Sequence, residues 1–504
     1  MSRGFSRRAF LGTALSALAA PAWAGAPSVS LRPKARPGDF ARTGTIATRG
    51  PSAPSTSALI AEAKLSGRVG FAVSDAKTGL VLEQGDGALG LPPASVTKAI
   101  TALYGLETLG PDHRFQTRLV ATGPISNGIL QGDLVLAGGG DPMLDTNALA
   151  GMAAALKKKG VRELRGKFRV WGGAVPFLRA IDETQPEHAG YNPSLSGLNL
   201  NYNRVHFEWK RSGDTYAITM DARSDKYRPD VTIARMRIAE RASPVYTYRA
   251  TGPRDDWTVA RRALGNGGAR WLPVRQPELY AGEVFATFAR AQGLKLGTPE
   301  ITKRAPSGTA IVSHQSEPLS DILRGMLRYS TNLTAEMIGL ATSAARLGKP
   351  VTLRTSAREM TAWAQSSLGM SGAKLVDHSG LGDASRLSAS SMARALGRAH
   401  RAGLLKPLLR DIPLRDARGR PLKNQPVNVV AKTGTLYFVS ALAGYMTTPD
   451  GAEMAFAIFT ASDSLRSTVD SSQDARPPGA ASWNRRAKKL QQALIERWGT
   501  VYGG

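Results

Sequence analysis

Apolar residues recur in short runs near both ends of this 504-residue chain, with a spacing that indicates β-strands. Residues 69–73 and 80–82 are two such runs separated by a polar turn, which is the pattern of a β-hairpin. Three further runs, at 427–430, 439–446 and 454–460, follow one another with short connections. Because short connections join antiparallel neighbours, we expect these strands to form one antiparallel sheet.

A second pattern has the period of a helix. Ile100, Leu103, Leu106 and Leu109 share one helical face, and Gly110 with Pro111 ends the repeat. Similar spacing predicts helices at 319–327, 333–345 and 483–498. The expected fold class is therefore α+β, with an antiparallel sheet flanked by helices.

The middle of the chain, residues 114–314, has a different pattern of apolar and polar residues. Strand-like alternation dominates there, for example at 205–209 and 231–234. We expect this segment to be an inserted accessory region of one or two β-rich domains. The flanking segments, 58–113 and 315–504, would then form one discontinuous domain.

The first residues have the features of an export signal. Arg7 and Arg8 precede a short apolar run at 9–22, and Ala22-Trp23-Ala24 suits signal peptidase. The run is too short for a membrane anchor, and no later segment is long and apolar enough to span a membrane. We expect residues 1–24 to be a twin-arginine signal peptide and the mature protein to be periplasmic.

The chain is strongly basic and lacks cysteine. Its 66 Lys and Arg outnumber 39 Asp and Glu, which gives a formal net charge of +27. Nucleic acid is a common partner of such a surface, but the export signal and the absence of a nucleic-acid-binding motif argue against it. An anionic cell-wall polymer fits better. Residues 25–57, rich in Pro, Gly, Ser, Thr and Arg, are expected to be a basic flexible linker.

Three short motifs supply groups for acyl transfer through a serine ester. They are Ser95-Val96-Thr97-Lys98, Ser330-Thr331-Asn332 and Lys432-Thr433-Gly434-Thr435. Residues three apart on a helix share a face, so the Lys98 amine can lie beside the Ser95 hydroxyl. Burial near a second cation, Lys432, would lower the Lys98 pKa and let the free amine accept the serine proton. Each motif alone is weak; their order and predicted elements make chance a poor explanation.

The three motifs together are the signature of penicillin-binding proteins and class A β-lactamases. About 235 residues separate Ser95 from Ser330, far more than a compact single-domain β-lactamase leaves there. The chain resembles the low-molecular-mass class C penicillin-binding proteins, the D-Ala-D-Ala carboxypeptidase/endopeptidase family typified by penicillin-binding protein 4 (peptidase family S13). Segments 139–142 and 377–381 extend that resemblance.

The resemblance implies a serine D,D-peptidase that acts on peptidoglycan stem peptides, needs no cofactor or metal, and is acylated by β-lactam antibiotics. Ser95 would be the nucleophile and Lys98 its base, with Ser330 and Asn332 completing the catalytic set. The implied substrate-binding residues are Lys432, Thr433, Gly434, Thr435 and Arg386.

Other features leave alternatives open. The family's acidic residue for the stem-peptide diamino acid has three candidates here, Asp182, Glu183 and Glu187. Arg386 is displaced from the family's position by inserted residues 382–384. A β-lactamase or esterase on the same site and a non-catalytic wall-binding protein are the rival functions. The balance of carboxypeptidase and endopeptidase activity, the diamino acid and the oligomeric state are left open.

Overall fold

The computed structural model describes residues 53–470 and 477–503. The predicted signal peptide and residues 25–52 of the predicted linker lie outside the described residues. Helix α1 (Thr56–Ala63) begins after Ser55, whose hydroxyl accepts the Ala58 N–H at 3.2 Å. The last residues of the predicted linker are therefore helical.

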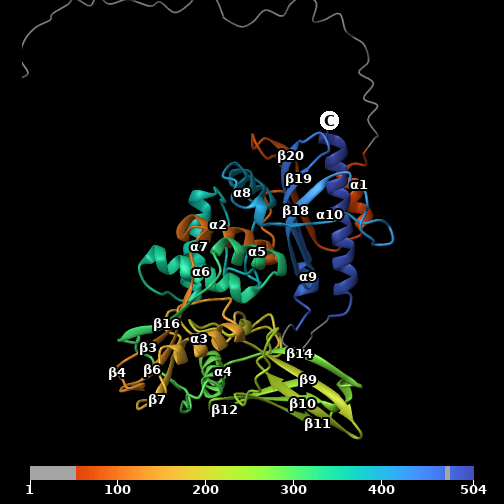
Figure 1. Cartoon of the computed structure of the whole chain (residues 1–504). Helices are drawn as coiled ribbons and strands as arrows, with labels where there is room; N and C mark the ends of the chain where they lie inside the picture. The colour runs from red at the N-terminus through yellow and green to blue at the C-terminus, as the bar shows by residue number, and fades with distance from the viewer. Residues whose placement is uncertain (1–52, 471–476, 504) are drawn as a thin grey trace, which may run out of the picture. The chain divides into compact units, whose positions relative to one another are not determined.

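A six-stranded antiparallel sheet brings the two ends of the described chain together (Figure 1). Its strand order is β17-β18-β19-β20-β1-β2. The predicted hairpin and the three later strands are confirmed, and the hairpin joins the later strands through pairing of β1 with β20. The bounds are β1 Arg68–Asp75, β2 Val81–Gly85, β17 Arg410–Asp411, β18 Asn428–Leu436, β19 Val439–Thr447 and β20 Glu453–Ala461.

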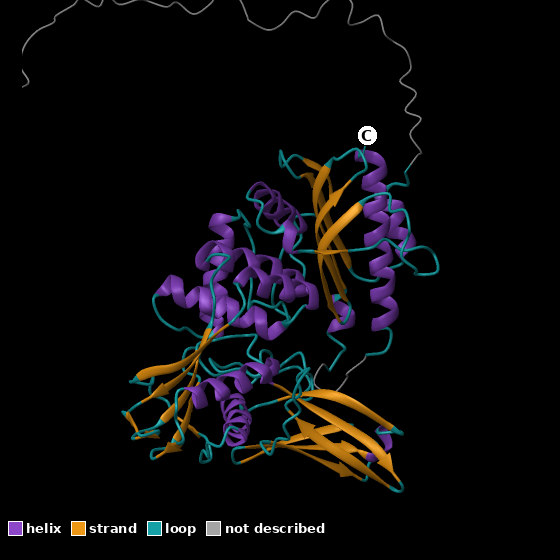
Figure 2. Ribbon diagram, in the orientation of Figure 1, coloured by secondary structure: helices purple, strands orange, loops and turns teal. Residues whose placement is uncertain are grey.

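Helices cover both faces of this sheet, which explains the continuous apolar runs of β19 and β20. On β19, Ala441 and Tyr445 face one helical layer, whereas Leu442 and Met446 face the other. Figure 2 shows the sheet between the two layers. The first layer contains α2 Thr97–Leu109, α5 Leu319–Tyr329, α6 Asn332–Leu347, α7 Leu353–Ser367 and α8 Ala389–Arg401. The second contains α1 and α10 Ala480–Tyr502.

Residues 116–315 form four further sheets. Their orders are β15-β8-β6-β3-β16, β10-β9-β14, β11-β13-β12 and β4-β5-β7. The bounds are β3 Gln116–Ala121, β4 Ile125–Ser126, β5 Ile129–Leu130, β6 Leu134–Gly138, β7 Glu163–Leu164, β8 Phe168–Trp171, β9 Arg204–Ser212, β10 Thr215–Asp221, β11 Ala234–Ala239, β12 Tyr246–Thr251, β13 Arg254–Ala260, β14 Gly267–Pro273, β15 Glu300–Ile301 and β16 Thr309–Gln315. The β-rich character expected of this region is confirmed.

Two details of this region differ from expectation. Helices α3 (Thr146–Lys158) and α4 (Pro277–Ala291) pack in its core, although strand-like alternation dominated the sequence pattern. The strand predicted at 231–234 is wrong, because β11 begins only at Ala234. The Glu283 carboxylate accepts the backbone N–H groups of Thr232 and Ile233, which bind this side chain and not a neighbouring strand.

The inserted region packs directly on helix α6. Leu333, Met337 and Leu340 of this helix form one buried cluster with Val175 and Leu195 of the insertion. Since α6 begins at Asn332, this contact places the insertion beside a predicted site residue.

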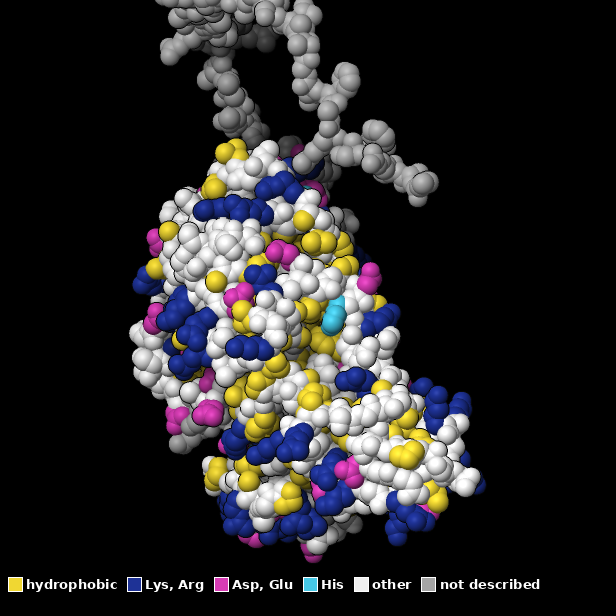
Figure 3. Space-filling model, turned by 90° about the vertical axis from the view of Figure 1, so that its left-hand side faces the viewer, with side chains coloured by type: hydrophobic (Ala, Val, Ile, Leu, Met, Phe, Trp, Pro, Cys, Tyr) yellow, Lys and Arg dark blue, Asp and Glu magenta, His cyan; other side chains and the backbone are white. Residues whose placement is uncertain are grey.

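Basic side chains are spread over the face drawn in Figure 3, with fewer acidic ones between them. This agrees with the formal charge of +27. Within residues 53–470 and 477–503, no helix combines the length and apolarity needed to cross a membrane.

Candidate active site

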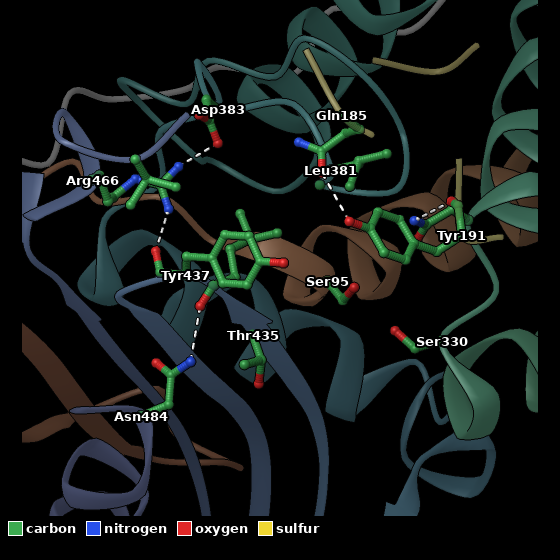
Figure 4. Close-up of a pocket in the computed structure, with 14 residues that line it drawn as sticks. Ser95, Gln185, Tyr191, Ser330, Leu381, Asp383, Thr435, Tyr437, Arg466 and Asn484 are labelled. Carbon is green, nitrogen blue, oxygen red and sulfur yellow. Dashed lines mark hydrogen bonds and ion pairs between the residues drawn. The ribbon is translucent and has the colours of Figure 1, made fainter. Parts of the chain in front are cut away.

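The three motifs meet at one cavity of about 350 Å³ (Figure 4). Ser95 lies in the 3-10 turn η1 (Ala94–Val96), which leads directly into α2 and Lys98. Ser330 ends α5 with φ +59°, a left-handed conformation that costs about 1–3 kcal/mol for a non-glycine residue. Asn332 begins α6, and Lys432 lies on β18. Ser95, Ser330, Asn332 and Thr435 line the cavity.

The amine of Lys98 is fully buried and has three oxygen neighbours. Its Nζ lies 3.0 Å from Ser95 Oγ, 2.7 Å from Asn332 Oδ1 and 2.7 Å from the Ser379 carbonyl oxygen. A neutral amine has two N–H donors and one lone pair. Because the amide and carbonyl oxygens can only accept, they take both donors, and the lone pair is left for the Ser95 hydroxyl.

Burial lowers the pKa of Lys98 to about 8. The expected repulsion between the two lysines is present, and it is expressed in the pKa of Lys432. The charges that act on Lys98 are those of Asp377 and Glu336, and both raise its pKa. Burial first, and then the charges of Lys98 and Arg410, lower the pKa of Lys432 well below its usual range. Desolvation alone is thus enough to make Lys98 a base near neutral pH.

Lys432 and Ser330 form a second hydrogen-bonded pair. Lys432 Nζ donates to Ser330 Oγ at 3.0 Å and to the Thr433 carbonyl at 2.7 Å. Its side chain is buried, whereas Thr435, three residues on, is exposed to the cavity. Lys432 is therefore joined to the cavity through Ser330, which lines it.

Strand β18 approaches the serine turn very closely at Gly434. A Cβ there would lie 2.7 Å from the Pro93 carbonyl oxygen and 3.0 Å from the Ser95 nitrogen. Within the described residues, β17 pairs with β18 only at Val430 and Ala431. The edge of β18 beyond them is thus open to the cleft, and glycine at 434 lets this edge lie against the nucleophile.

Arg386 is not brought to this cavity. Its backbone pairs with Lys374, and its Nη1 donates to the carbonyls of Asp383 and Ser385. The cavity is lined instead by Arg466, which donates to the Tyr437 carbonyl at 2.8 Å and pairs with Asp383. Figure 4 shows Arg466 reaching across the rim of the cavity to both partners.

The insertion contributes two cavity residues that sequence reasoning missed. Tyr191 and Gln185 line the pocket, and the Tyr191 hydroxyl donates to Gln185 Oε1 at 3.1 Å. The Tyr191 carbonyl accepts Asn332 Nδ2 at 2.9 Å, which turns Asn332 Oδ1 toward Lys98. No local motif marks these residues, since they come from a segment about 140 residues before Asn332.

The three acidic candidates for diamino acid recognition differ in their contacts. Asp182 accepts Thr184 and Gln185 through its carboxylate, next to the cavity residue Gln185. Glu187 pairs with Arg179 and Arg275. None of these acidic residues is among those lining the cavity.

Glu336 is fully buried against His378 and Ser379 and does not line the cavity. It therefore has no direct path to a water molecule in the cavity. Within the described residues, no group of three or more His, Asp or Glu is placed to hold a metal ion.

Comparison with known proteins agrees with this geometry. Residues 54–479 match the D-Ala-D-Ala carboxypeptidase 3 (S13) family. The chain is 30% identical over 437 residues to a D-alanyl-D-alanine carboxypeptidase of Actinomadura sp. (strain R39), covering 80% of this chain and 79% of that one. It is 24% identical over 417 residues to the D-alanyl-D-alanine carboxypeptidase DacB of Haemophilus influenzae, covering 78% and 85%.

A solved structure shares the fold of this chain. The crystal structure of penicillin binding protein 4 (dacB) from Haemophilus influenzae matches with a TM-score of 0.72 at 20% identity, over 88% of this chain and 99% of that one. The chain therefore belongs to the D-Ala-D-Ala carboxypeptidase 3 (S13) family, and it is an enzyme of the serine carboxypeptidase type.

Proposed function

We propose that Ser95 is the residue acylated by the substrate and that Lys98 is its general base. The Ser95 oxygen attacks the carbonyl carbon of the penultimate D-Ala while its proton passes to the Lys98 lone pair. The resulting ammonium can donate to Ser95 Oγ, Asn332 Oδ1 and the Ser379 carbonyl, the three oxygens already within 3.0 Å. The base thus needs no movement between its neutral and charged forms.

Ser330 is proposed to return the proton. When the C–N bond breaks, the leaving amine needs a proton, and the Ser330 hydroxyl supplies it and is resupplied by the Lys432 ammonium at 3.0 Å. Water then attacks the Ser95 ester and gives one proton through Ser330 to Lys432, while Lys98 returns its proton to Ser95 Oγ as the ester bond breaks. The shortened peptide leaves, and Ser95, Lys98 and Lys432 regain their starting protonation states. Asn332 holds the substrate amide through the Nδ2 hydrogen that the Tyr191 carbonyl leaves unused.

Lys432, Thr433, Gly434 and Thr435 are proposed to receive the substrate along the open edge of β18. A terminal D-Ala carboxylate would meet the Lys432 ammonium and the hydroxyls of Thr433 and Thr435. The backbone N–H groups of Ser95 and Thr435 are proposed as the oxyanion donors. Gly434 supports this assignment, because its missing side chain keeps these two N–H groups within reach of one carbonyl.

The observation that carries the proposal is the buried Lys98 amine, whose Nζ lies 3.0 Å from Ser95 Oγ and whose other two polar neighbours, Asn332 Oδ1 and the Ser379 carbonyl, can only accept hydrogen bonds. A wall-binding protein has no use for a buried amine whose pKa is about 8 beside a hydroxyl. A class A β-lactamase places a glutamate for rapid ester hydrolysis, whereas Glu336 is buried away from the cavity here. The site thus favours a D,D-peptidase that forms a long-lived penicillin ester.

Labelled penicillin tests the nucleophile. The adduct is expected on the peptide that contains Ser95, located by proteolysis and mass spectrometry, and it should be absent from Ser95→Ala. Retention of the adduct in Ser95→Ala would refute the assignment. Slow release of the label supports a peptidase, and release within seconds would identify a β-lactamase instead.

The substrates we propose are peptidoglycan stem peptides ending in D-Ala-D-Ala and D,D-crosslinks, which present the same D-Ala carbonyl. Incubation with intact crosslinked muropeptides, with products separated by mass, distinguishes the two. Loss of one terminal D-Ala marks carboxypeptidase activity, and conversion of dimers to monomers marks endopeptidase activity.

We further propose that residues 1–24 direct export to the periplasm by the twin-arginine route, and that residues 58–113 with 315–504 form the catalytic domain around an inserted region. Arg7 and Arg8 before a short apolar run support the route. Replacing both with Lys should leave precursor in the cytoplasm. Undiminished periplasmic delivery would assign the general secretory route.

A further inference from the structure

A buried carboxylate and a buried imidazole form a hydrogen-bonded pair next to the turn that contacts Lys98. Glu336 Oε2 is 2.8 Å from His378 Nδ1, and neither side chain is exposed to solvent. Burial raises the pKa of Glu336, but hydrogen bonds from His378 and Ser379 outweigh it and the pKa is lowered, so the side chain is a carboxylate. A carboxylate in the protein interior is costly unless several donors satisfy it. Here the donors all come from one short turn.

The carboxylate of Glu336 fixes that turn by three hydrogen bonds. It accepts the His378 N–H at 3.0 Å, the Ser379 N–H at 2.9 Å and the His378 ring at 2.8 Å. Thr101, on the helix of Lys98, donates to the His378 carbonyl at 2.6 Å. Residues 378 and 379 are thus held by side chains from two different helices, α6 and α2.

Helix α6 is shaped to accept the imidazole ring. Gly339 lies one turn after Glu336, and a Cβ there would be 2.0 Å from His378 Cδ2. The other ring nitrogen, Nε2, lies 2.9 Å from Ser356 Oγ on α7. Every polar group of His378 therefore has a partner, and the ring has no room to turn.

The turn ends on the catalytic amine. Ser379, whose N–H is bound by Glu336, presents its carbonyl oxygen 2.7 Å from Lys98 Nζ. That oxygen is one of the two acceptors that direct the Lys98 lone pair at Ser95. We propose that the buried Glu336–His378 pair is a positioning element for acylation, which acts by holding the Ser379 carbonyl against Lys98.

This inference rests on the proposed role of Lys98 and makes a separate claim, that residues out of reach of the substrate set the acylation rate. Without the Glu336–His378 pair, the Ser379 carbonyl should shift, and the Lys98 amine should no longer be held in one orientation toward Ser95. Misplacement of a catalytic group by about 1 Å costs on the order of 100-fold in rate. Penicillin affinity before acylation should hardly change, because neither Glu336 nor His378 lines the cavity.

Glu336→Gln tests the claim, since it keeps the size of the side chain but replaces one acceptor with a donor that faces the N–H groups of the turn. The acylation rate constant with labelled penicillin should fall about 10- to 100-fold, with the dissociation constant of the preceding complex within about threefold. Ile338→Val, which removes one buried methyl from the same helix, is the matched control and should acylate as wild type.

A second pair of variants separates positioning from folding. His378→Ala removes the donor to Glu336, whereas the side-chain amide of His378→Asn can replace it, so Asn should restore much of the rate that Ala loses. Glu336→Gln and His378→Ala should be non-additive in the double variant, because they break one unit. If Glu336→Gln does not fold, the His378 variants decide the question.

Several results would overturn the inference: an acylation rate in Glu336→Gln equal to that of Ile338→Val, equal losses in His378→Ala and His378→Asn, or strict additivity. The proposed function fails in a different way, by absence of any Ser95 adduct in the wild-type enzyme. Normal wild-type acylation together with full activity of the variants would therefore overturn this inference alone.

Discussion

The surroundings of Lys98 and Lys432 differ, although both lysines are buried and both border Ser95 or Ser330. Burial lowers the pKa of each. The carboxylates Asp377 and Glu336 then raise that of Lys98, whereas the charges acting on Lys432, those of Lys98 and Arg410, lower it further. The positive charge of Lys98 thus has carboxylate neighbours within the protein, whereas the charged neighbours that act on Lys432 are cations.

This difference in neighbouring charge is the basis of the roles that we propose for the two lysines. Lys98 has its countercharges behind it and needs no anion from the substrate, so it can cycle a proton at a fixed position. Lys432 is surrounded by cations, and an incoming carboxylate would supply the countercharge that favours its ammonium form. Burial thus lowers the pKa of both amines, and in the proposed mechanism the substrate carboxylate separates their roles by favouring the ammonium form of Lys432 alone.

Among the changes to the two lysines, removing the Lys98 amine should lower the acylation rate the most. Lys98→Ala is expected to lower the acylation rate constant by about 10²- to 10⁴-fold, the usual contribution of a positioned base, and penicillin affinity far less. Stopped-flow acylation with labelled penicillin measures both quantities. Lys349→Ala, at an exposed lysine, is the control. Near-normal acylation of Lys98→Ala at neutral pH would assign the proton to another group.

The pH profile is the next test. Only the neutral amine accepts a proton, so wild-type acylation should rise about tenfold per pH unit below the Lys98 pKa and level off above about 8. A rate that has already levelled off at pH 6 would contradict the assignment of Lys98 as base.

Lys432→Ala should have a smaller effect that depends on the substrate. A hydrogen bond between charged groups contributes about 1.5–3 kcal/mol, so cleavage of a peptide with a free terminal carboxylate should fall roughly 10- to 100-fold. Amidation of that carboxylate should bring wild type and variant closer together, because both changes break one charge pair. Strict additivity in this double cycle would show that Lys432 does not read the carboxylate.

Substitution of Arg466 or Arg386 should have the smallest effects on KM, and the two effects should differ. Arg466 joins the Tyr437 carbonyl to the exposed Asp383 at the rim, and a pair with a solvent-exposed partner contributes about 1 kcal/mol or less. Arg466→Ala should therefore raise the KM for stem peptides about two- to fivefold. Arg386→Ala should leave KM within about twofold, since Arg386 does not line the cavity and its side chain donates to backbone carbonyls. A larger loss in Arg386→Ala would restore it as a substrate-binding residue.

Local patterns predicted much of this molecule. Continuous apolar runs predicted β19 and β20, since helices cover both their faces, and three short motifs predicted the residues that meet around Ser95. Contacts made over long sequence separations could not be predicted in the same way. The carbonyl of Tyr191 orients Asn332 from 141 residues away, and His378 pairs with Glu336 from 42 residues away. Neither contact leaves a periodic or spaced signal in the sequence.

Gly434 has a consequence for antibiotic resistance. The atoms that a Cβ would meet there are the backbone atoms of Pro93 and Ser95 and the Cβ of Ala94, none of which a change of rotamer can move aside. A larger residue at 434 would separate the strand from the nucleophile and disable the enzyme toward drug and natural substrate alike. Variants that lose acylation by β-lactams while keeping peptidase activity are therefore not expected at position 434, and the cavity rim at the exposed Asp383 is a better place to seek them.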